Sequence, residues 1–221
     1  MRVRIKICCI SSVAEAKIAI EYGADAIGLV GKMPSGPGPI EDTLIAEIAK
    51  TVPPPIATFL LTSEQSSKNI VQHLKRTGTN TVQIVDELTE GAYEEIREAL
   101  PNIRLVQVIH VQNHESIEQA IRVQDDVDVI LLDSGNPGAT IKTLGGTGNV
   151  HNWEISRELV KAVKLPVFLA GGLYAGNVKT AIETVHPFGV DLCSGVRTNG
   201  LLDRKKLSDF VRAANAALIS E

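Results

Sequence analysis

The sequence predicts a single domain, residues 1–221, of the α/β class and folded as a (β/α)8 barrel. Three observations support this fold. Eight short runs of aliphatic and β-branched residues alternate strictly with eight segments of helical periodicity, as expected for parallel strands joined by helices. The 221 residues give about 28 residues per strand and helix unit, near the lower limit for a closed barrel of eight units. No Gly/Ser-rich linker or low-complexity tract divides the chain.

The expected elements follow one another along the whole chain. Apolar runs predict strands near residues 3–9, 25–30, 55–61, 79–85, 103–111, 127–132, 166–170 and 189–193. Helical periodicity predicts helices over Val13–Tyr22, Asp42–Thr51, Ser66–Arg76, Gly91–Leu100, Ser116–Val123, Glu154–Val163, Gly176–Val185 and Asp203–Leu218. An open doubly wound sheet shows the same alternation, but it carries a glycine-rich fingerprint after its first strand. Here Cys8-Cys9-Ile10-Ser11 follows that strand, so the barrel is favoured.

The composition excludes several classes of protein. With 44% hydrophobic residues, 22% charged residues and a mean hydropathy of +0.09, the chain resembles folded globular proteins rather than disordered ones. A formal net charge of -4 gives no general cationic field, so we expect no nucleic-acid partner. No apolar run reaches the roughly 18 to 20 residues that cross a bilayer, and the first residues lack the features of a secretion signal. We therefore expect a cytoplasmic protein without a membrane partner.

The spacing of cysteine and histidine predicts neither a disulfide framework nor a metal site. Cys8 and Cys9 are adjacent and Cys193 is far away in the sequence, so we expect free thiols. His110 and His114 have the i, i+4 spacing of some metal ligands, but a strand end and a loop lie between them. We expect no metal, and the chain carries no motif of a P-loop enzyme, serine hydrolase or zincin.

Glycine-rich exits from the last three strands predict a phosphate site. In a (β/α)8 barrel the substrate is bound by the loops after the carboxyl ends of the strands, and phosphate commonly lies near the last strands. Glycine lacks a Cβ, so the backbone N–H groups of such loops can approach an anion closely. The candidate phosphate-binding residues are Gly146, Gly148, Gly171, Gly172, Ser194 and Gly195. Turns between strands and helices also use glycine for structural reasons, which is the alternative interpretation.

Two side chains near strand ends are candidates for proton transfer. Alternation along the first strand places Lys6 and Cys8 toward the barrel interior and Cys9 toward the helices. A thiol beside a lysine and open to substrate can act as a base, although a small buried core residue is the alternative. Asp133 ends the apolar run 129–132, where burial would raise the pKa of its carboxyl group; a turn or N-cap aspartate is the alternative. The other aspartates near strands are expected to be structural: Asp25, Asp128 and Asp191.

These motifs, taken in order, resemble the phosphoribosylanthranilate isomerase family. The resemblance covers most of the chain and is carried by Lys6-Ile7-Cys8, Gly23 to Gly28, Thr81-Val82-Gln83-Ile84, Leu131 to Ser134, Gly145 to Gly148, Asn152-Trp153, Leu169 to Leu173, Asn177-Val178 and Gly189 to Val196. It implies a (β/α)8 barrel that performs an Amadori rearrangement of N-(5-phosphoribosyl)anthranilate in tryptophan biosynthesis, without metal or organic cofactor. It also implies that Asp133 protonates the ring oxygen of the sugar as general acid and that Cys8 removes the C2 proton as general base. Lys6 and Gln83 are further candidate substrate contacts.

Several positions depart from the pattern of that family. Cys9 stands where the family has glycine, and Gly38 falls where an arginine would bind the anthranilate carboxylate. Val85-Asp86-Glu87 replaces a Leu-His-Gly segment, and residues 193–197 replace Ser-Ser-Gly-Val-Glu by Cys-Ser-Gly-Val-Arg. The candidates for the missing cation, and therefore for a substrate contact, are Arg197, Lys32 and Arg4.

Three functions are consistent with the sequence. The first is the isomerase itself, supported by Cys8, Asp133 and the glycine-rich loops. The second is a related barrel isomerase that acts on another phosphorylated aminoaldose, because the expected arginine is missing. The third is a non-catalytic barrel that binds a phosphosugar, because a fold alone does not fix a function. In each case the partner is a small phosphosugar, and the sequence leaves a homodimer open.

Overall fold

Eight parallel strands close into a barrel in the computed structural model of the chain, which describes residues 2–135 and 151–217. The strands are β1 (Arg4–Ile7), β2 (Ala26–Val30), β3 (Ala57–Thr62), β4 (Thr81–Ile84), β5 (Arg104–His110), β6 (Val129–Asp133), β7 (Val167–Leu169) and β8 (Gly189–Leu192). Each strand pairs with the next, and β8 pairs with β1, so the sheet has no free edge. The prediction of a (β/α)8 barrel is confirmed.

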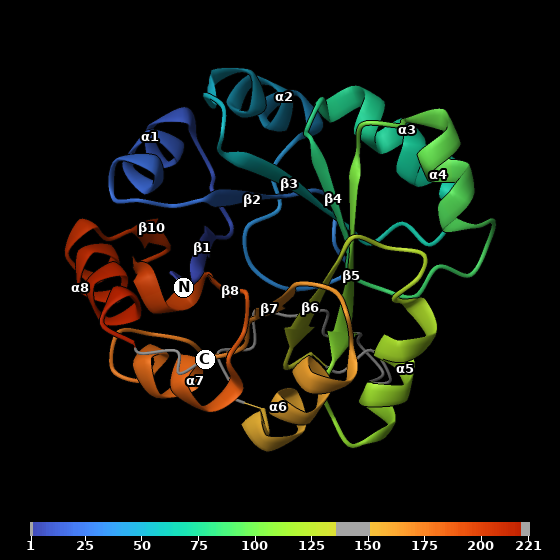
Figure 1. Cartoon of the computed structure of the whole chain (residues 1–221). Helices are drawn as coiled ribbons and strands as arrows, with labels where there is room; N and C mark the ends of the chain where they lie inside the picture. The colour runs from blue at the N-terminus through green and yellow to red at the C-terminus, as the bar shows by residue number, and fades with distance from the viewer. Residues whose placement is uncertain (1, 136–150, 218–221) are drawn as a thin grey trace.

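The helices form an outer layer around the barrel (Figure 1). They are α1 (Val13–Glu21), α2 (Asp42–Thr51), α3 (Ser67–Thr77), α4 (Tyr93–Ala99), α5 (Glu115–Val123), α6 (Trp153–Ala162), α7 (Val178–Val185) and α8 (Arg204–Asn215). Ile5 and Ile7 of β1 are fully buried in the layer between the strands and the helices. No helix in the described ranges is long and apolar enough to cross a membrane.

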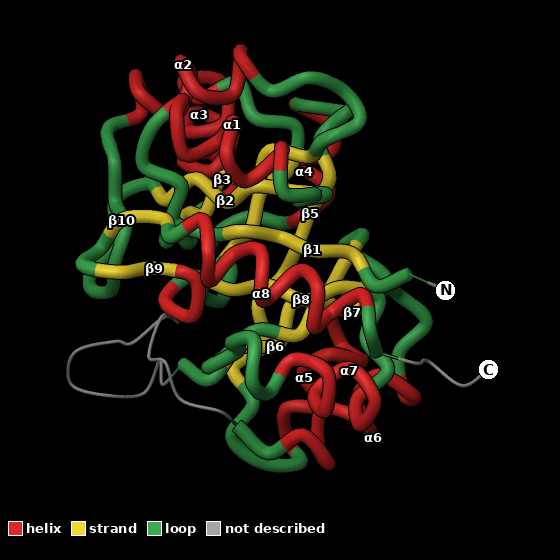
Figure 2. The backbone as a smooth tube through the Cα atoms, turned by 90° about the vertical axis from the view of Figure 1, so that its left-hand side faces the viewer, coloured by secondary structure: helices red, strands yellow, loops and turns green. Residues whose placement is uncertain are grey.

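A short hairpin and one 3-10 turn follow β8 and were not predicted. The turn η1 (Ser194–Val196) leads into β9 (Arg197–Thr198), which pairs with β10 (Leu201–Leu202). Strands of two residues are too short for a hydrophobic period to be seen. The available signal was the Asn199-Gly200 dipeptide, whose φ angles of 51° and 80° suit a tight hairpin turn. Figure 2 shows this hairpin next to the start of α8.

A second apolar cluster fills the inside of the barrel. It includes Cys8, Phe59, Leu131 and Phe168, and the rings of Phe59 and Phe168 meet edge to face with centroids 6.1 Å apart. The Lys6 side chain is also fully buried here, and its Nζ lies 5.1 Å from the centre of the Phe59 ring. This packing fills the interior of the barrel, and the candidate site lies above it at the carboxyl ends of the strands.

Candidate active site

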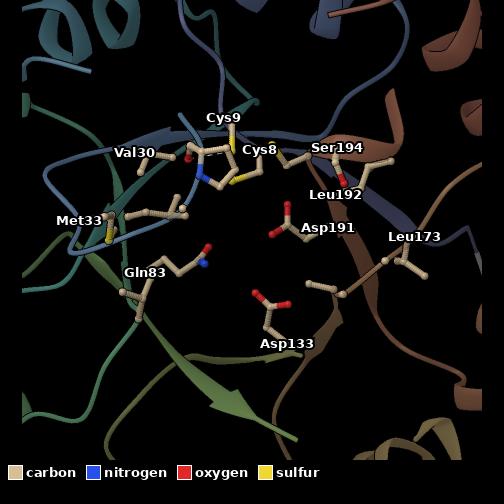
Figure 3. A pocket seen from close by; sticks show the side chains of 18 of the residues that line it. Cys8, Cys9, Val30, Met33, Gln83, Asp133, Leu173, Asp191, Leu192 and Ser194 are labelled. Carbon is tan, nitrogen blue, oxygen red and sulfur yellow. Dashed lines mark hydrogen bonds between the residues drawn. The ribbon is translucent and has the colours of Figure 1, made fainter. Parts of the chain in front are cut away.

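Cys8 and Asp133 lie on opposite sides of one pocket at the carboxyl ends of the strands (Figure 3). Cys8 directly follows β1, and its backbone N–H donates to the Leu192 carbonyl at 2.8 Å, which fixes the end of β1 against β8. Gly28 of β2 makes room for this arrangement, because a Cβ there would lie 2.8 Å from Cys8 Sγ and 3.1 Å from Lys6 Nζ. The Cys8 thiol and the Lys6 ammonium group therefore both lie against position 28, where only glycine leaves room for them.

Asp133 is the last residue of β6 and presents its carboxyl group to the pocket. Burial raises the pKa of Asp133, and the negative charge of Asp191 acts in the same direction. The Ser134 N–H, which donates to the carboxylate at 2.7 Å, and nearby His110 oppose this rise without cancelling it. A carboxyl group that holds its proton to a higher pH is suited to act as a general acid.

Asp191 lies in the pocket and pairs with Lys6, contrary to the prediction that it is a structural residue at a strand start. β8 begins at Gly189, and the register places Asp191 opposite Lys6 of β1, so both side chains point into the barrel. Lys6 Nζ lies 2.9 Å from the Asp191 carboxylate. Burial alone would lower the pKa of Lys6, but the charge of Asp191, with a smaller effect of Cys8, raises it. The pair thus keeps an ammonium group below the pocket.

Cys9 also lines the pocket, so the prediction that it packs against the helices was wrong. Side-chain alternation holds only while a strand continues, and β1 ends at Ile7. The φ angle of Cys9 is 59°, in the left-handed region, and this turn brings its side chain back to the side of Cys8. The Cys9 sulfur lies 3.7 Å from the Pro37 carbonyl oxygen, on the loop after β2.

The described candidate phosphate residues meet at one part of the pocket rim. Gly171, Gly172 and Ser194 line the pocket, and Gly195 follows directly. Gly171 and Gly172 have φ angles of 85° and 63°, a conformation that favours glycine. A Cβ at Gly195 would lie 2.0 Å from the Leu173 carbonyl oxygen, so the loops after β7 and β8 pack too closely for a side chain. The remaining two candidates, Gly146 and Gly148, lie outside the described residues.

Gln83 points into the pocket from β4 (Figure 3). The residue is 3% exposed, and its Oε1 has no hydrogen-bond partner among the described residues. A buried carbonyl oxygen without a partner is costly, so Gln83 is placed to bind a donor group of a ligand.

Neither Arg197 nor Arg4 supplies a cation to the pocket. Arg197 does not line it, because its guanidinium donates to the Glu15 carboxylate and to the Gly200 carbonyl, both at 2.9 Å. Arg4 lies at the amino end of β1, 3.5 Å from Asp25. The structure gives neither arginine a place in the pocket wall, so a substrate contact from Arg197 stays an untested prediction; Lys32, exposed just after β2, stays a candidate. The predicted structural role of Asp25 agrees with its bond from the Ile5 N–H at 2.9 Å.

Two residues singled out in the sequence, Cys9 and Gly38, contact each other beside the pocket wall. Gly38 has a φ angle of 87°, and a Cβ there would lie 2.7 Å from Cys9 Cβ. The Cys9 side chain therefore fills the space in which a side chain at position 38 would lie. Among the described residues that line this pocket, none is a lysine or an arginine.

The remaining polar groups of the described residues include those of a second cavity. The described ranges contain no group of three or more His, Cys, Asp or Glu side chains arranged to hold a metal ion. A second cavity lies by α4 and α5, with a volume of about 530 Å³ against about 80 Å³ for the pocket of Cys8. Tyr93 donates to Gln107 there at 2.8 Å, and Val85 borders both cavities. The larger cavity holds neither Cys8 nor Asp133, so the smaller one carries the candidate chemistry.

Comparison with known proteins places these residues in a family. The model of N-(5'phosphoribosyl)anthranilate (PRA) isomerase matches residues 5–213. N-(5'-phosphoribosyl)anthranilate isomerase 2 of Methanosarcina mazei is 37% identical over 213 residues, which cover 96% of this chain and 93% of that protein. A crystal structure of phosphoribosyl anthranilate isomerase in complex with reduced 1-(o-carboxyphenylamino)-1-deoxyribulose 5-phosphate is 26% identical, with a TM-score of 0.77 over 96% of this chain and 98% of that chain. A structure of monomers made from the dimeric isomerase of Thermotoga maritima is 25% identical, with a TM-score of 0.76 over 96% and 98% of the two chains.

Proposed function

The chain belongs to the N-(5'-phosphoribosyl)anthranilate isomerase family, and we propose that it catalyses the aldose to ketose rearrangement of that substrate. The product is 1-(2-carboxyphenylamino)-1-deoxyribulose 5-phosphate. Asp133 acts as the general acid and Cys8 as the general base. The observation that carries this proposal is the placement of one carboxyl group and one thiol on opposite sides of a pocket whose rim holds Gly171, Gly172 and Ser194.

The first step is opening of the sugar ring. Asp133 donates its proton to the ring oxygen, the bond between C1 and that oxygen breaks, and the nitrogen lone pair forms a protonated Schiff base. The acid must hold its proton until substrate binds, and burial favours the protonated form by raising the pKa of Asp133.

The second step is removal of the proton at C2. The Cys8 thiolate takes this proton, the electron pair of the C2–H bond forms a double bond between C1 and C2, and the π pair of the C1 to nitrogen bond returns to nitrogen to give an enolamine. The ketose forms when C1 gains a proton and the C2 hydroxyl group loses one. A thiolate that acts as base carries a negative charge. The Lys6 ammonium group, which is held by Asp191 at 2.9 Å, flanks Gly28 together with the Cys8 sulfur, and a nearby positive charge favours the thiolate.

The phosphate group holds the sugar between acid and base. We assign it to the loops after β7 and β8, where Gly171, Gly172, Ser194 and Gly195 lie, and to Gly146 and Gly148. Binding energy from a group that does not react can be used to orient the one that does. Gln83 lies across the pocket and can accept a hydrogen bond from a sugar hydroxyl group.

The aromatic end of the substrate is where the chain departs from its family. Lys32, exposed after β2, is the described basic residue that we propose for the anthranilate carboxylate. The lack of a lysine or arginine among the described lining residues favours a second candidate function, rearrangement of another phosphorylated aminoaldose. The two are separated by kcat/KM for phosphoribosylanthranilate and for its analogue without the carboxyl group. A ratio near one supports the second function, and a strong preference for the carboxylate supports the first.

The fluorescence of phosphoribosylanthranilate provides the test of the reaction. Purified protein should remove this fluorescence, whereas Cys8→Ala and Asp133→Asn should each lower kcat by at least about 100-fold. Asp209→Asn makes the same carboxyl to amide change on exposed α8 and should retain wild-type activity. A wild-type protein that binds the substrate without turnover would support the non-catalytic phosphosugar-binding barrel instead.

Two further expectations concern the state of the enzyme. We propose that this chain forms a homodimer, because the similar isomerase of Thermotoga maritima is described as dimeric. Light scattering after size-exclusion chromatography would show a single species of about twice the 23.7 kDa chain mass if this is correct, and the chain mass if it is wrong. The cytoplasmic location drawn from the sequence stays a prediction.

A further inference from the structure

The three cysteines of the chain lie together in one wall of the pocket, although Cys193 is far from the others in sequence. Cys8 and Cys9 belong to the apolar cluster inside the barrel, and Cys193 packs against that cluster. The proposed reaction uses Cys8 alone. Cys9 and Cys193 are therefore two free thiols in the same pocket wall as the reacting groups, without a role in proton transfer.

The backbone places these two residues just after the ends of neighbouring strands. β1 and β8 are parallel neighbours, and Ile7 and Leu192, near their ends, are partners in register. Neighbouring strands lie about 4.8 Å apart, and disulfides join Cα atoms about 4.4 to 6.8 Å apart. By this register Cys193 follows Leu192 opposite Cys8, and the left-handed turn at Cys9, one residue further, brings its side chain to the same wall. A left-handed backbone conformation is unfavourable for a residue other than glycine, so the presence of cysteine at position 9 carries a conformational cost.

The surroundings make the two thiols chemically unequal. The hydrogen bond from the Cys9 thiol lowers the pKa of Cys193; burial opposes this shift, and the positive charge of Arg197 assists it. The same hydrogen bonding, together with burial, raises the pKa of Cys9. Arg197 is held in place by Glu15 at 2.9 Å. Cys193 is also only partly buried and borders the pocket, whereas Cys9 is 6% exposed. Cys193 is thus the thiol that meets a reagent first, and Cys9 is its partner.

We propose that Cys9 and Cys193 are a redox-active pair that forms a reversible disulfide by exchange with a low-molecular-weight disulfide. The Cys193 thiolate attacks one sulfur of the reagent, which forms a mixed disulfide and releases one small thiolate. The Cys9 sulfur then attacks Cys193, its proton passes to the second departing small thiolate, and the protein disulfide is complete. Two protein thiols are oxidised and one small disulfide is reduced to two thiols.

The disulfide would act on catalysis through the loop after β2, a consequence that rests on the proposed function. The Cys9 sulfur lies 3.7 Å from the Pro37 carbonyl, and Gly38 packs on its Cβ. When the Cys9 sulfur bonds to Cys193, it loses its contact with this loop, whose residues Ser35 to Pro37 form part of the pocket wall. The same movement displaces the backbone of Cys9, which is next to Cys8. Because displacements of about 1 Å can cost about 100-fold in rate, we expect kcat/KM to fall at least about tenfold.

Thiol counting and peptide mapping after equilibration with hydroxyethyl disulfide test the pair without any activity measurement. We expect the reactive thiols of the unfolded protein to fall from three per chain to one, with mass spectrometry showing a Cys9 to Cys193 cross-link that dithiothreitol removes. Cys8→Ala should form the same cross-link, and Cys193→Ser should form none. For the effect on catalysis, each protein is compared with its own reduced form, and the fall in kcat/KM should disappear in Cys193→Ser.

Three unmodified thiols in treated wild-type protein, or a cross-link through Cys8 in place of Cys9, would overturn the proposal. So would a cross-link in wild type that is absent from folded Cys8→Ala. Cys9→Ser provides a second variant if Cys193→Ser does not fold, and it too should lack the cross-link. If the protein shows no isomerase activity but still forms the cross-link, the proposed function fails while the thiol pair stands.

Discussion

Replacing Lys6 with methionine would remove one charge from the buried pair beneath the pocket while keeping most of the side-chain volume. Lys6 is 0% exposed and Asp191 is 5% exposed, and their charged atoms lie 2.9 Å apart. Removal of one partner from such a pair leaves an uncompensated buried charge, which costs about 3 to 5 kcal/mol. Domains of this kind have a total unfolding free energy of about 5 to 15 kcal/mol. We therefore expect Lys6→Met to lower the urea midpoint strongly.

The double variant Lys6→Met with Asp191→Asn separates lost pairing from lost packing. It removes both charges, so it should be more stable than Lys6→Met alone, as a buried pair replaced as a unit often costs little. Lys205→Met is the matched control, because the Lys205 ammonium pairs with Asp209 at 2.7 Å but is 85% exposed. That variant should show no measurable change, since solvent screens an exposed pair.

Two results of these unfolding curves would refute the reasoning. The first is a shift for Lys6→Met no larger than that for Lys205→Met. The second is a double variant whose loss of unfolding free energy equals the sum of the losses for Lys6→Met alone and Asp191→Asn alone, because independent effects add. Either result would mean that Lys6 and Asp191 do not depend on each other for their place in the barrel.

Three further results are expected. The kcat/KM of the wild type should fall as pH rises through the raised pKa of Asp133, because the acid loses its proton, and this limb should be missing from the residual activity of Asp133→Asn. Gly28→Ala should lower kcat about 100-fold, since its Cβ would lie 2.8 Å from Cys8 Sγ, whereas Gly78→Ala, with no atom within 4 Å, should alter stability alone. Burial alone would raise the pKa of Glu15, but its hydrogen bonds and ion pair hold it below the ordinary value. The contribution of Glu15 to stability is therefore present above its unfolded pKa and lost as pH falls through its folded pKa. Urea midpoints measured between about pH 3 and 7 should fall less on acidification for Glu15→Gln than for the wild type. An equal fall in both proteins would contradict this role of Glu15.

The fold could be predicted because each strand and helix carries its own hydrophobic period. β2 and α2 follow from local sequence, since Ala26–Val30 is buried along its whole length and the helix Asp42–Thr51 has one buried stripe. The hairpin of β9 and β10 depends on two turn residues and shows no hydrophobic period, so a search for apolar runs does not find it.

The site could be predicted only where strand geometry alone places a side chain. Asp133 ends a strand and Cys8 keeps the interior parity of β1, so both were expected in the pocket. Cys9 depends on a backbone turn that a cysteine rarely adopts, and Asp191 depends on the register between β1 and β8. Arg197 depends on Glu15, which is 182 positions away, and no local pattern shows such a partner.

The most direct test of the two-sided site is a crystal structure of this enzyme with reduced 1-(o-carboxyphenylamino)-1-deoxyribulose 5-phosphate bound. We expect the Cys8 sulfur against C2 of the sugar chain, the Asp133 carboxyl group against the oxygen that closes the ring in the substrate, and the phosphate against Gly171, Gly172 and Ser194. A ligand whose phosphate lies elsewhere, or whose C2 is out of reach of Cys8, would contradict the assignment of base and acid.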